Sequence, residues 1–265
     1  MRGSDASERH PPGTQAIQDQ LGEPYRRYHA AARRLHAQLV STVLRPDDLA
    51  LATEQRGDRE WTLTVCMADH VGGLSVIAGL LTAHQIDVTG AGVFTLTLDV
   101  SDGAPAPAAS GRRTRRRRRP QRAPVPARLM LGIFELRTLE PAAPDWDAFE
   151  RDLQAAVSMM AGSGLDTVRA LVMDRVSETV RLDEQRETRL LPVSIDVDQE
   201  ASPDATVMRI SSSDTPGFLF EFTNALALLD ANIARAEIRT GEEVAQDTFW
   251  LTDARAAQGH GRGAA

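Results

Sequence analysis

Apolar and polar residues form one pattern that appears twice along this chain. Between residues 65 and 81, a strand-like apolar run leads into Asp69-His70-Val71-Gly72-Gly73-Leu74 and then into a short apolar helix. Between residues 207 and 229, a second run leads into Asp214-Thr215-Pro216-Gly217-Phe218-Leu219 and another apolar helix. The two turn glycines are 145 residues apart (217 − 72). A supersecondary unit that recurs with diverged side chains predicts a duplicated module.

The segments after the two predicted helices also match. Gln85-Ile86-Asp87-Val88 and Asn232-Ile233-Ala234-Arg235 each open a second strand. In the first unit, alternation predicts strands and helical spacing predicts helices. The strands are expected at 49–53, 61–67, 86–98, 129–136 and 168–173, and the helices at 73–84 and 145–160. The order β-α-β-β-α-β is that of a ferredoxin-like module.

The second unit is expected to be incomplete. Strands are predicted at 207–210, 233–239 and 244–251 around a helix at 217–230, and a strand at 191–197 has no obvious partner. The second helix and the fourth strand of the repeat have no counterpart, so this module is predicted to stop after its third strand. The fold class is therefore α+β, with modules at 49–174 and 191–253.

The remaining segments are predicted from composition. Residues 1–22 and 254–265 are expected to be disordered, and 175–190 a charged connector. An N-terminal amphipathic helix is expected within 23–48. Residues 101–127 are rich in Ala, Pro and Arg, which predicts a disordered insertion at the tip of a hairpin.

Charge and cysteine content narrow the function classes. The net charge is −7, and residues 112–119 carry seven arginines, so the remainder sums to about −14 (−7 − 7). That acidic remainder argues against nucleic acid as the main partner of the folded parts. The arginine run by itself is consistent with a solvated loop or with binding to nucleic acid or an acidic partner. Cys66 is the only cysteine, which excludes an internal disulfide and a cysteine-based zinc site. Its side chain is expected to lie in the core. No apolar leader or membrane segment is visible, which predicts a cytoplasmic protein without a membrane partner.

The chain resembles a known family. Two small modules that each open with Asp-x-x-Gly-x-Leu resemble ACT domains. The stretches 191–196, 214–219, 236–240 and 247–253 resemble the C-terminal regulatory half of bacterial PII-protein uridylyltransferases and related adenylyltransferase-like proteins, and 74–84 resembles the first helix of the other module. The resemblance covers roughly residues 25–253. It implies a regulatory portion of a nitrogen-metabolism nucleotidyltransferase.

The resemblance and the turn chemistry together predict an amino-acid site, with glutamine as the first ligand. The first helical turn offers free backbone N–H groups to a carboxylate, and a carboxylate or amide side chain accepts from the ammonium. ACT modules commonly bind amino acids at this turn, against the second strand of a paired module. The expected ligand-binding residues are Asp69, His70, Val71, Gly72, Gly73, Asp87, Asp214, Thr215, Pro216, Gly217 and Asn232.

Other interpretations remain open. Asp followed by Gly at a strand–helix junction is also an ordinary cap and turn, and a ligand-free module that serves only to dimerise or assemble is the alternative function. An enzyme is not favoured, because neither a nucleotidyltransferase nor a phosphohydrolase motif is present, and no cofactor is expected. His29 and His36 lack partners at metal-ligand spacing, so no metal is expected. Expected partners are an amino acid, a second copy of the chain, or a catalytic nucleotidyltransferase.

Overall fold

A computed structural model describes residues 12–98, 128–162, 164–182, 194–213, 217–241 and 244–253. Within these residues the protein has the predicted α+β class, with seven helices and a single antiparallel sheet of eight strands. The helices are α1 (Thr14–Leu21), α2 (Glu23–Arg26), α3 (Ala30–Thr42), α4 (Gly73–Ala83), α5 (Trp146–Gly162), α6 (Leu165–Leu182) and α7 (Phe218–Leu228). The strands are β1 (Leu49–Gln55), β2 (Glu60–Ala68), β3 (Ile86–Thr97), β4 (Arg128–Thr138), β5 (Ser194–Asp198), β6 (Thr206–Ser213), β7 (Ala231–Thr240) and β8 (Val244–Asp253).

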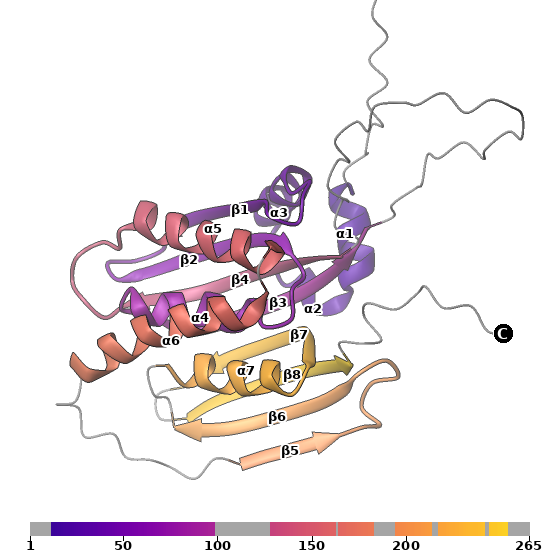
Figure 1. The fold of residues 1–265 in the computed structure, drawn as a ribbon. Helices are drawn as coiled ribbons and strands as arrows, with labels where there is room; N and C mark the ends of the chain where they lie inside the picture. Colours follow the sequence, from indigo (N-terminus) through magenta and orange to yellow (C-terminus); the bar gives the residue numbers. More distant parts are fainter. Residues whose placement is uncertain are drawn as a thin grey trace, which may run out of the picture.

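The sheet consists of two halves with the same strand order. Its order is β1-β2-β4-β3-β7-β8-β6-β5, so β3 and β7 pair antiparallel at the join (Figure 1). From the join outward, the strands of the first half are β3, β4, β2 and β1, and those of the second half are β7, β8, β6 and β5. The two halves therefore have the same strand order. The register breaks at Val88/Gly90 in β3 and at Ile233/Arg235 in β7, again 145 residues apart (233 − 88). Because the equivalent strands β3 and β7 pair antiparallel, the two halves are related by a pseudo-two-fold axis.

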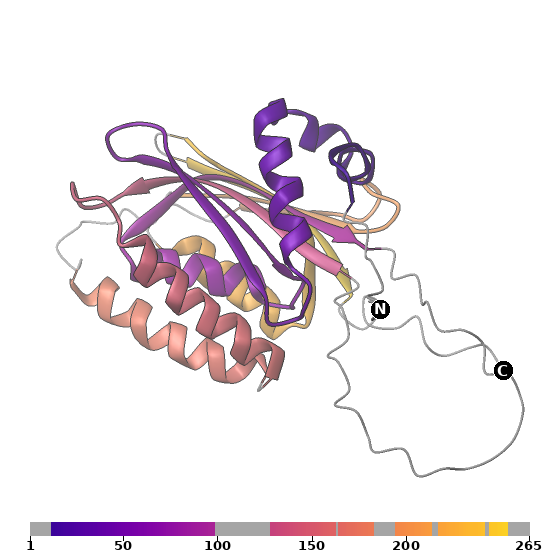
Figure 2. The same ribbon diagram turned by 90° about the horizontal axis from the view of Figure 1, so that it is seen from above.

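The two faces of the sheet are covered differently. Helices α4, α5, α6 and α7 lie on one face, and α1, α2 and α3 lie on the other face of the first half only (Figure 2). The sequence accounts for this difference. On the face that carries α1, α2 and α3, the strands of the first half present apolar residues such as Cys66, Phe94 and Leu131. On the same face of the second half, β7 presents Arg235 and Glu237. Cys66 is fully buried as predicted, and burial raises the pKa of its thiol to about 12.

The N-terminal region is more ordered than predicted. Residues 14–21, expected to be disordered, form α1, and the expected helix region contains the short α2 and the longer α3. Ile17 anchors α1 in the core, and Gln20 exchanges two hydrogen bonds with the backbone of Thr97. A single apolar residue per turn was too weak a signal to reveal α1 from the sequence.

Two element predictions were wrong. Residues 168–173 belong to helix α6 rather than to a strand, and α6 also includes the first part of the expected connector. Val168, Val172 and Val176 recur every four residues and are buried against the other helices, which is helical spacing that a short apolar run conceals. The fourth strand of the first half is β1 instead, and it pairs with β2 at the edge of the sheet.

The second half has the same arrangement, so the prediction that it lacks a fourth strand was also wrong. The strand expected near 191–197 is β5, and its partner is β6, with Ile195 opposite Ile210. Residues 101–127 and 254–265 lie outside the described residues. The strands on either side of 101–127 do pair as the predicted hairpin, with Thr97 opposite Arg128.

Candidate functional site

The two glycine turns adopt the same backbone conformation. Gly72 and Gly217 precede α4 and α7 with φ values of +79° and +84°, in the left-handed region that favours glycine. No side chain caps either helix. The first-turn N–H groups of both helices therefore have no side-chain acceptor at the cap position, which is a property of anion-binding turns.

Each turn faces the start of the strand that follows the helix (α4 or α7) in the other half. The Gly72 turn lies against Asn232 of β7, and the Gly217 turn lies against Asp87 of β3. The strand starts align differently from the sequence-based match, which set Gln85 beside Asn232. Gln85 corresponds instead to Asp230, because both have positive φ (58° and 55°) directly after a helix. Asp87 and Asn232 are then equivalent, 145 residues apart (232 − 87).

At the first turn, Asp69 is engaged by both halves. Its side chain is 5% exposed, its Oδ2 lies 2.9 Å from Nη2 of Arg128, and it accepts a hydrogen bond from the side chain of Asn232. Burial raises the pKa of the Asp69 carboxyl, and the opposing effects of Arg128, His70, Thr95 and Asn232 do not cancel that rise. The enclosed space at this turn is only about 10 Å³. Asp69 therefore already links the two halves without a ligand.

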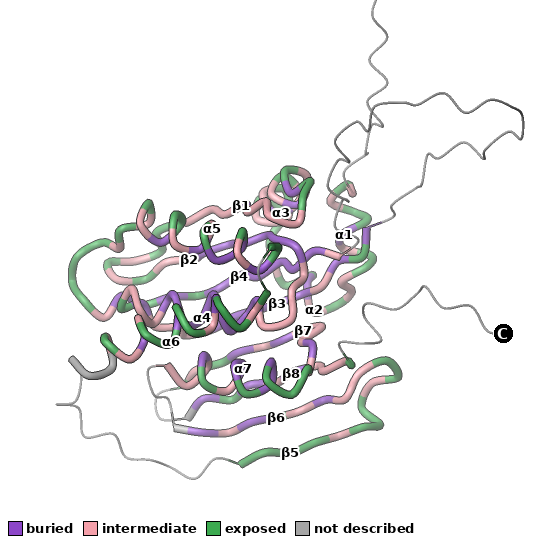
Figure 3. Tube along the Cα trace, in the orientation of Figure 1, coloured by how far each residue is buried: buried purple, intermediate pink, exposed green. Residues whose placement is uncertain are grey.

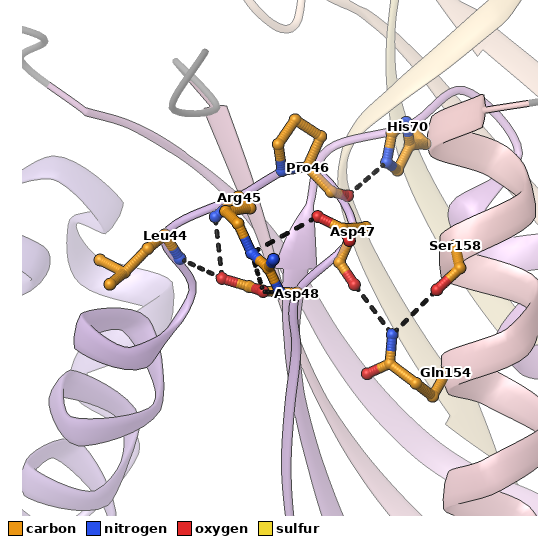
Figure 4. Close-up of polar contacts among 8 residues, drawn as sticks. All are labelled: Leu44, Arg45, Pro46, Asp47, Asp48, His70, Gln154 and Ser158. Atoms are coloured by element: carbon orange, nitrogen blue, oxygen red, sulfur yellow. Dashed lines mark hydrogen bonds and ion pairs between the residues drawn. The ribbon is translucent and has the colours of Figure 1, made fainter. Parts of the chain in front are cut away.

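His70 ties the first turn to the loop that precedes β1. Its Nε2 lies 3.3 Å from the carbonyl oxygen of Pro46 (Figure 4). On the other side of that loop, Nε2 of Gln154 in α5 donates to the carbonyl oxygen of Asp47 at 2.8 Å. Asp48 accepts from the backbone N–H groups of Leu44 and Arg45, both at 2.9 Å. In the same turn, Val71 is half-buried and Gly73 is buried. The contact of His70 with Pro46 connects this turn to the loop before β1.

The second turn encloses more space. Gly217, Asp87 and the side chains around them border a cavity of about 40 Å³, room for about one water molecule. Asp214, Thr215 and Pro216 lie outside the described residues. Sequence reasoning missed three polar residues that line this cavity, which are Thr82, Thr240 and Asp247. Asp247 carries a signal in the sequence, because it falls between the buried Ala245 and Phe249 at an inward strand position.

A larger cleft lies on the opposite face of the sheet, beneath α3. It measures about 650 Å³, within the usual range of ligand pockets, and its lining includes Arg27, Tyr28, His36, Arg56 and Glu135. None of the expected ligand-binding residues lines it.

The two histidines of this region have structural roles. Nδ1 of His29 accepts from the backbone N–H of Ala32 and so caps α3. His36 is buried and lies 2.9 Å from the hydroxyl of Tyr25, and burial lowers the pKa of its imidazole to about 4. Among the described residues, no three His, Cys, Asp or Glu side chains gather as a metal site would require.

The fold and the two turns define a duplicated α+β protein in which each glycine turn lies against the other half across the join. The chain is similar to bifunctional uridylyltransferase/uridylyl-removing enzymes. It is 26% identical to that of Rhodospirillum rubrum over 229 residues, which cover 85% of this chain and 21% of the relative. It is 28% identical to that of Azospirillum brasilense over 221 residues, 82% of this chain and 20% of the relative. A shorter stretch of 85 residues is 33% identical to that of Bradyrhizobium sp. ORS 278, 32% of this chain and 9% of that relative.

These comparisons confirm the resemblance to the uridylyltransferase family for one region of those enzymes. The chain spans about a fifth of the length of the relatives from Rhodospirillum rubrum and Azospirillum brasilense. No family model and no solved structure matches the chain. Within the described residues, no helix is both long enough and apolar enough to cross a membrane.

Proposed function

We propose that this chain is a regulatory region made of two ACT modules, which responds to an amino acid, with glutamine as the first candidate. One observation carries the proposal: each uncapped glycine turn lies against a polar side chain at the start of the strand that follows the helix in the other half. An amino acid presents a carboxylate and an ammonium close together, and this juxtaposition offers groups for both. The similarity to a region of uridylyltransferases supports a place in nitrogen metabolism.

The second turn is the better amino-acid site. In the proposed complex, the N–H groups at the start of α7 bind the carboxylate, and Asp87 and Asp247 lie within reach of the ammonium. The space at the second turn is about 40 Å³, against about 10 Å³ at the first turn, so the second turn has more room for a ligand. Asp214, Thr215 and Pro216 directly precede Gly217 in the sequence, so the proposal includes them as ligand-binding residues of the second turn.

The small size of the second cavity suggests a mechanism. A space of about 40 Å³ does not admit an amino acid, so α4 and α7 must separate before one binds. A ligand that binds only the open arrangement shifts the population toward it. The size of the shift is set by the difference in affinity between the two arrangements. A catalytic domain or a second copy of the chain that contacts these helices would then sense the change.

Ligand-dependent thermal unfolding tests this proposal. Each of the twenty amino acids is added to the purified chain, and one present at about 100 times its dissociation constant adds about 2.7 kcal/mol. A selective shift that Asp87→Ala abolishes and the equivalent substitution Asn232→Ala preserves would establish the second turn as the site. The opposite pattern would move the site to the first turn.

A ligand-free assembly module is the second candidate function. The small cavities at both turns favour it, because a pairing that is already closed needs no ligand to hold it. If no amino acid shifts a cooperative unfolding transition, the assembly function replaces the sensor.

A further inference from the structure

The cleft beneath α3 has an exposed mouth and a buried inner end. Strand β2, which forms part of its floor, changes from exposed to buried along its length (Figure 3), with Glu60 exposed, Thr62 half-buried and Thr64 buried. On the neighbouring strand β4, Glu135 is exposed and Ile133, which pairs with Thr64, is buried. All five residues line the cleft. Burial therefore increases in the same direction along both strands of the floor.

The charged side chains of the cleft lie at its mouth. The arginines and glutamates that line it are all exposed, and they are Arg27, Glu54, Arg56, Glu60 and Glu135. Nη1 of Arg56 lies 2.9 Å from Oε1 of Glu54. Charges of both signs are present, so the mouth selects neither for an anion nor for a cation.

Two polar side chains at the inner end have hydrogen-bonding capacity that the protein does not use. His36 and Thr64 both line the cleft, and they are only 1% and 3% exposed. Nδ1 of His36 lies 2.9 Å from the hydroxyl of Tyr25, but its Nε2 has no hydrogen-bond partner among the described residues. The Thr64 hydroxyl forms no hydrogen bond to the part of the chain that the structure describes. A buried polar group without a partner costs free energy, so a ligand that pairs with both groups is stabilised there.

The inner end favours an uncharged ligand. Burial lowers the pKa of His36 to about 4, so its imidazole is neutral near neutral pH. A neutral imidazole and a hydroxyl can pair with a hydrogen-bond donor and an acceptor, whereas neither offsets the lost hydration of a buried ammonium or carboxylate. Leu35 and Ile133 add apolar contact surface, and the small side chain of Ala32 leaves room between α3 and the sheet.

We propose that this cleft binds a small uncharged molecule in which a carboxamide-like group is attached to an apolar ring or chain. The carboxamide-like group pairs with His36 and Thr64, and the apolar part lies against Leu35 and Ile133. Apolar walls with a few convergent polar groups are typical of small-molecule sites. The site lies on the opposite face of the sheet from the glycine turns, so it does not depend on the proposed amino-acid site. A molecule bound there contacts α3, β2 and β4 together and so stabilises α3 on the sheet.

Three probes of nearly the same size and shape test the proposal. Benzamide carries an uncharged carboxamide on an apolar ring, benzoate carries an anionic group on the same ring, and benzamidine carries a cationic one. Each probe is titrated into the isotope-labelled full chain near neutral pH, and the amide chemical shifts are followed by NMR. Saturable shifts for benzamide are expected in α3, β2 and β4. Its dissociation constant is expected to be at least tenfold lower than that of either charged probe.

Two substitutions locate the bound probe. Thr64→Val keeps the shape of the side chain and removes only the hydroxyl, which has no partner to lose among the described residues. It should weaken benzamide binding at least fivefold. Ala32→Leu fills the space beneath α3 and should abolish binding. Thr53→Val is the matched control and should leave binding unchanged, because Thr53 pairs with Leu63, whose side chain lies in the core on the other face of the sheet.

Three results would overturn the proposal. One is no saturable binding of benzamide up to about 10 mM, the limit for a molecule of its size that binds with ordinary efficiency per atom. Another is binding of benzoate or benzamidine as tight as that of benzamide, because charges at the mouth would then hold the ligand. The third is benzamide binding that Thr64→Val and Ala32→Leu both leave unchanged, because the probe would then lie elsewhere on the chain.

Discussion

Gly92 of β3 and Glu237 of β7 lie directly opposite each other at the join of the two halves. Their numbers differ by 145 (237 − 92), the same interval that separates the turn glycines, so the pseudo-two-fold axis passes through this pair. The side chains nevertheless differ. A Cβ at Gly92 would lie 2.4 Å from the hydroxyl of Tyr28, whereas Glu237 forms an ion pair with Arg235 at 2.5 Å. The backbone is thus symmetric, but only the first half has room for the N-terminal helices.

The turn glycines are expected to differ in their tolerance of alanine. Both have positive φ, which costs an alanine about 1–2 kcal/mol. At Gly72 the added Cβ would also lie 2.8 Å from Leu165, whereas at Gly217 its nearest neighbour is Thr82 at 3.6 Å. Gly72→Ala should therefore reduce the free energy of unfolding more than Gly217→Ala, as measured by urea denaturation. Equal losses would show that α6 does not pack against the first turn.

Much of the fold could be predicted because both glycine turns, and the alternation of apolar and polar residues in the strands, recur in the two halves of the sequence. The α+β class, the paired β3 and β4, and the helices after Gly72 and Gly217 followed from local patterns. Where the prediction failed, the deciding contacts were long-range. In the segment 165–182 the four-residue spacing of the valines is concealed by a short apolar run, and burial of these valines in the core stabilises the helix. Strand β5 pairs with β6, a partner that its own residues do not specify.

The candidate site was predictable only in part. The turns themselves were recognised, but the facing of Asp87 toward Gly217 depends on the antiparallel pairing of β3 with β7. Asp247 comes from yet another strand, so only tertiary structure brings it to the cavity. Arg128, which neutralises Asp69, follows the long insertion and gives no signal of its partner in the sequence.

Gly79 of α4 provides a test of packing between the halves. Replacing glycine by alanine inside a helix normally stabilises it by about 1 kcal/mol. A Cβ at Gly79, however, would lie 2.3 Å from Val172 of α6 and 2.7 Å from Phe220 of α7. Overpacking of this kind costs about 1–3 kcal/mol, so Gly79→Ala should lower the free energy of unfolding in chemical denaturation. Gly162→Ala, where nothing lies within 4 Å, is the control and should be neutral or stabilising.

Asp69 is expected to make stability fall as the pH rises. Because burial raises its pKa in the folded chain above the ordinary value of 3.8, the folded state binds more protons than the unfolded state above that pH. The contribution of Asp69 to stability therefore declines as the pH rises from 3.8 through the folded pKa. Asp69→Asn removes this contribution. The free energy of unfolding of the native chain minus that of Asp69→Asn, from urea melts at several pH values, should decrease with pH. A flat difference would contradict the assignment.

Arg128 should be the costlier partner to lose. Arg128→Ala leaves the buried Asp69 carboxylate without its cation, and breaking such a pair costs about 3–5 kcal/mol. Adding Asp69→Asn to Arg128→Ala should recover part of that loss, because no buried charge then remains. A double-mutant cycle in urea measures the recovery. If the losses in unfolding free energy of the two single variants simply add, the Arg128–Asp69 ion pair does not help to join the β3–β4 hairpin to the first turn.

Asp152 should show the opposite pH dependence to Asp69. Burial by itself would raise its pKa, but hydrogen bonds from Arg175 and His84 outweigh burial and lower the pKa below 3.8. A lowered folded pKa contributes stability that is present above the unfolded pKa and is lost as the pH falls through the folded value. Asp152→Asn should therefore cost about 1–2 kcal/mol near neutral pH. That cost should shrink as the pH is lowered below 3.8, with denaturant midpoints as the measurement. Glu150→Gln, at an exposed position of the same helix, is the matched control for removing one carboxylate. A cost of Asp152→Asn that persists in acid would mean that Asp152 acts by packing instead of by charge.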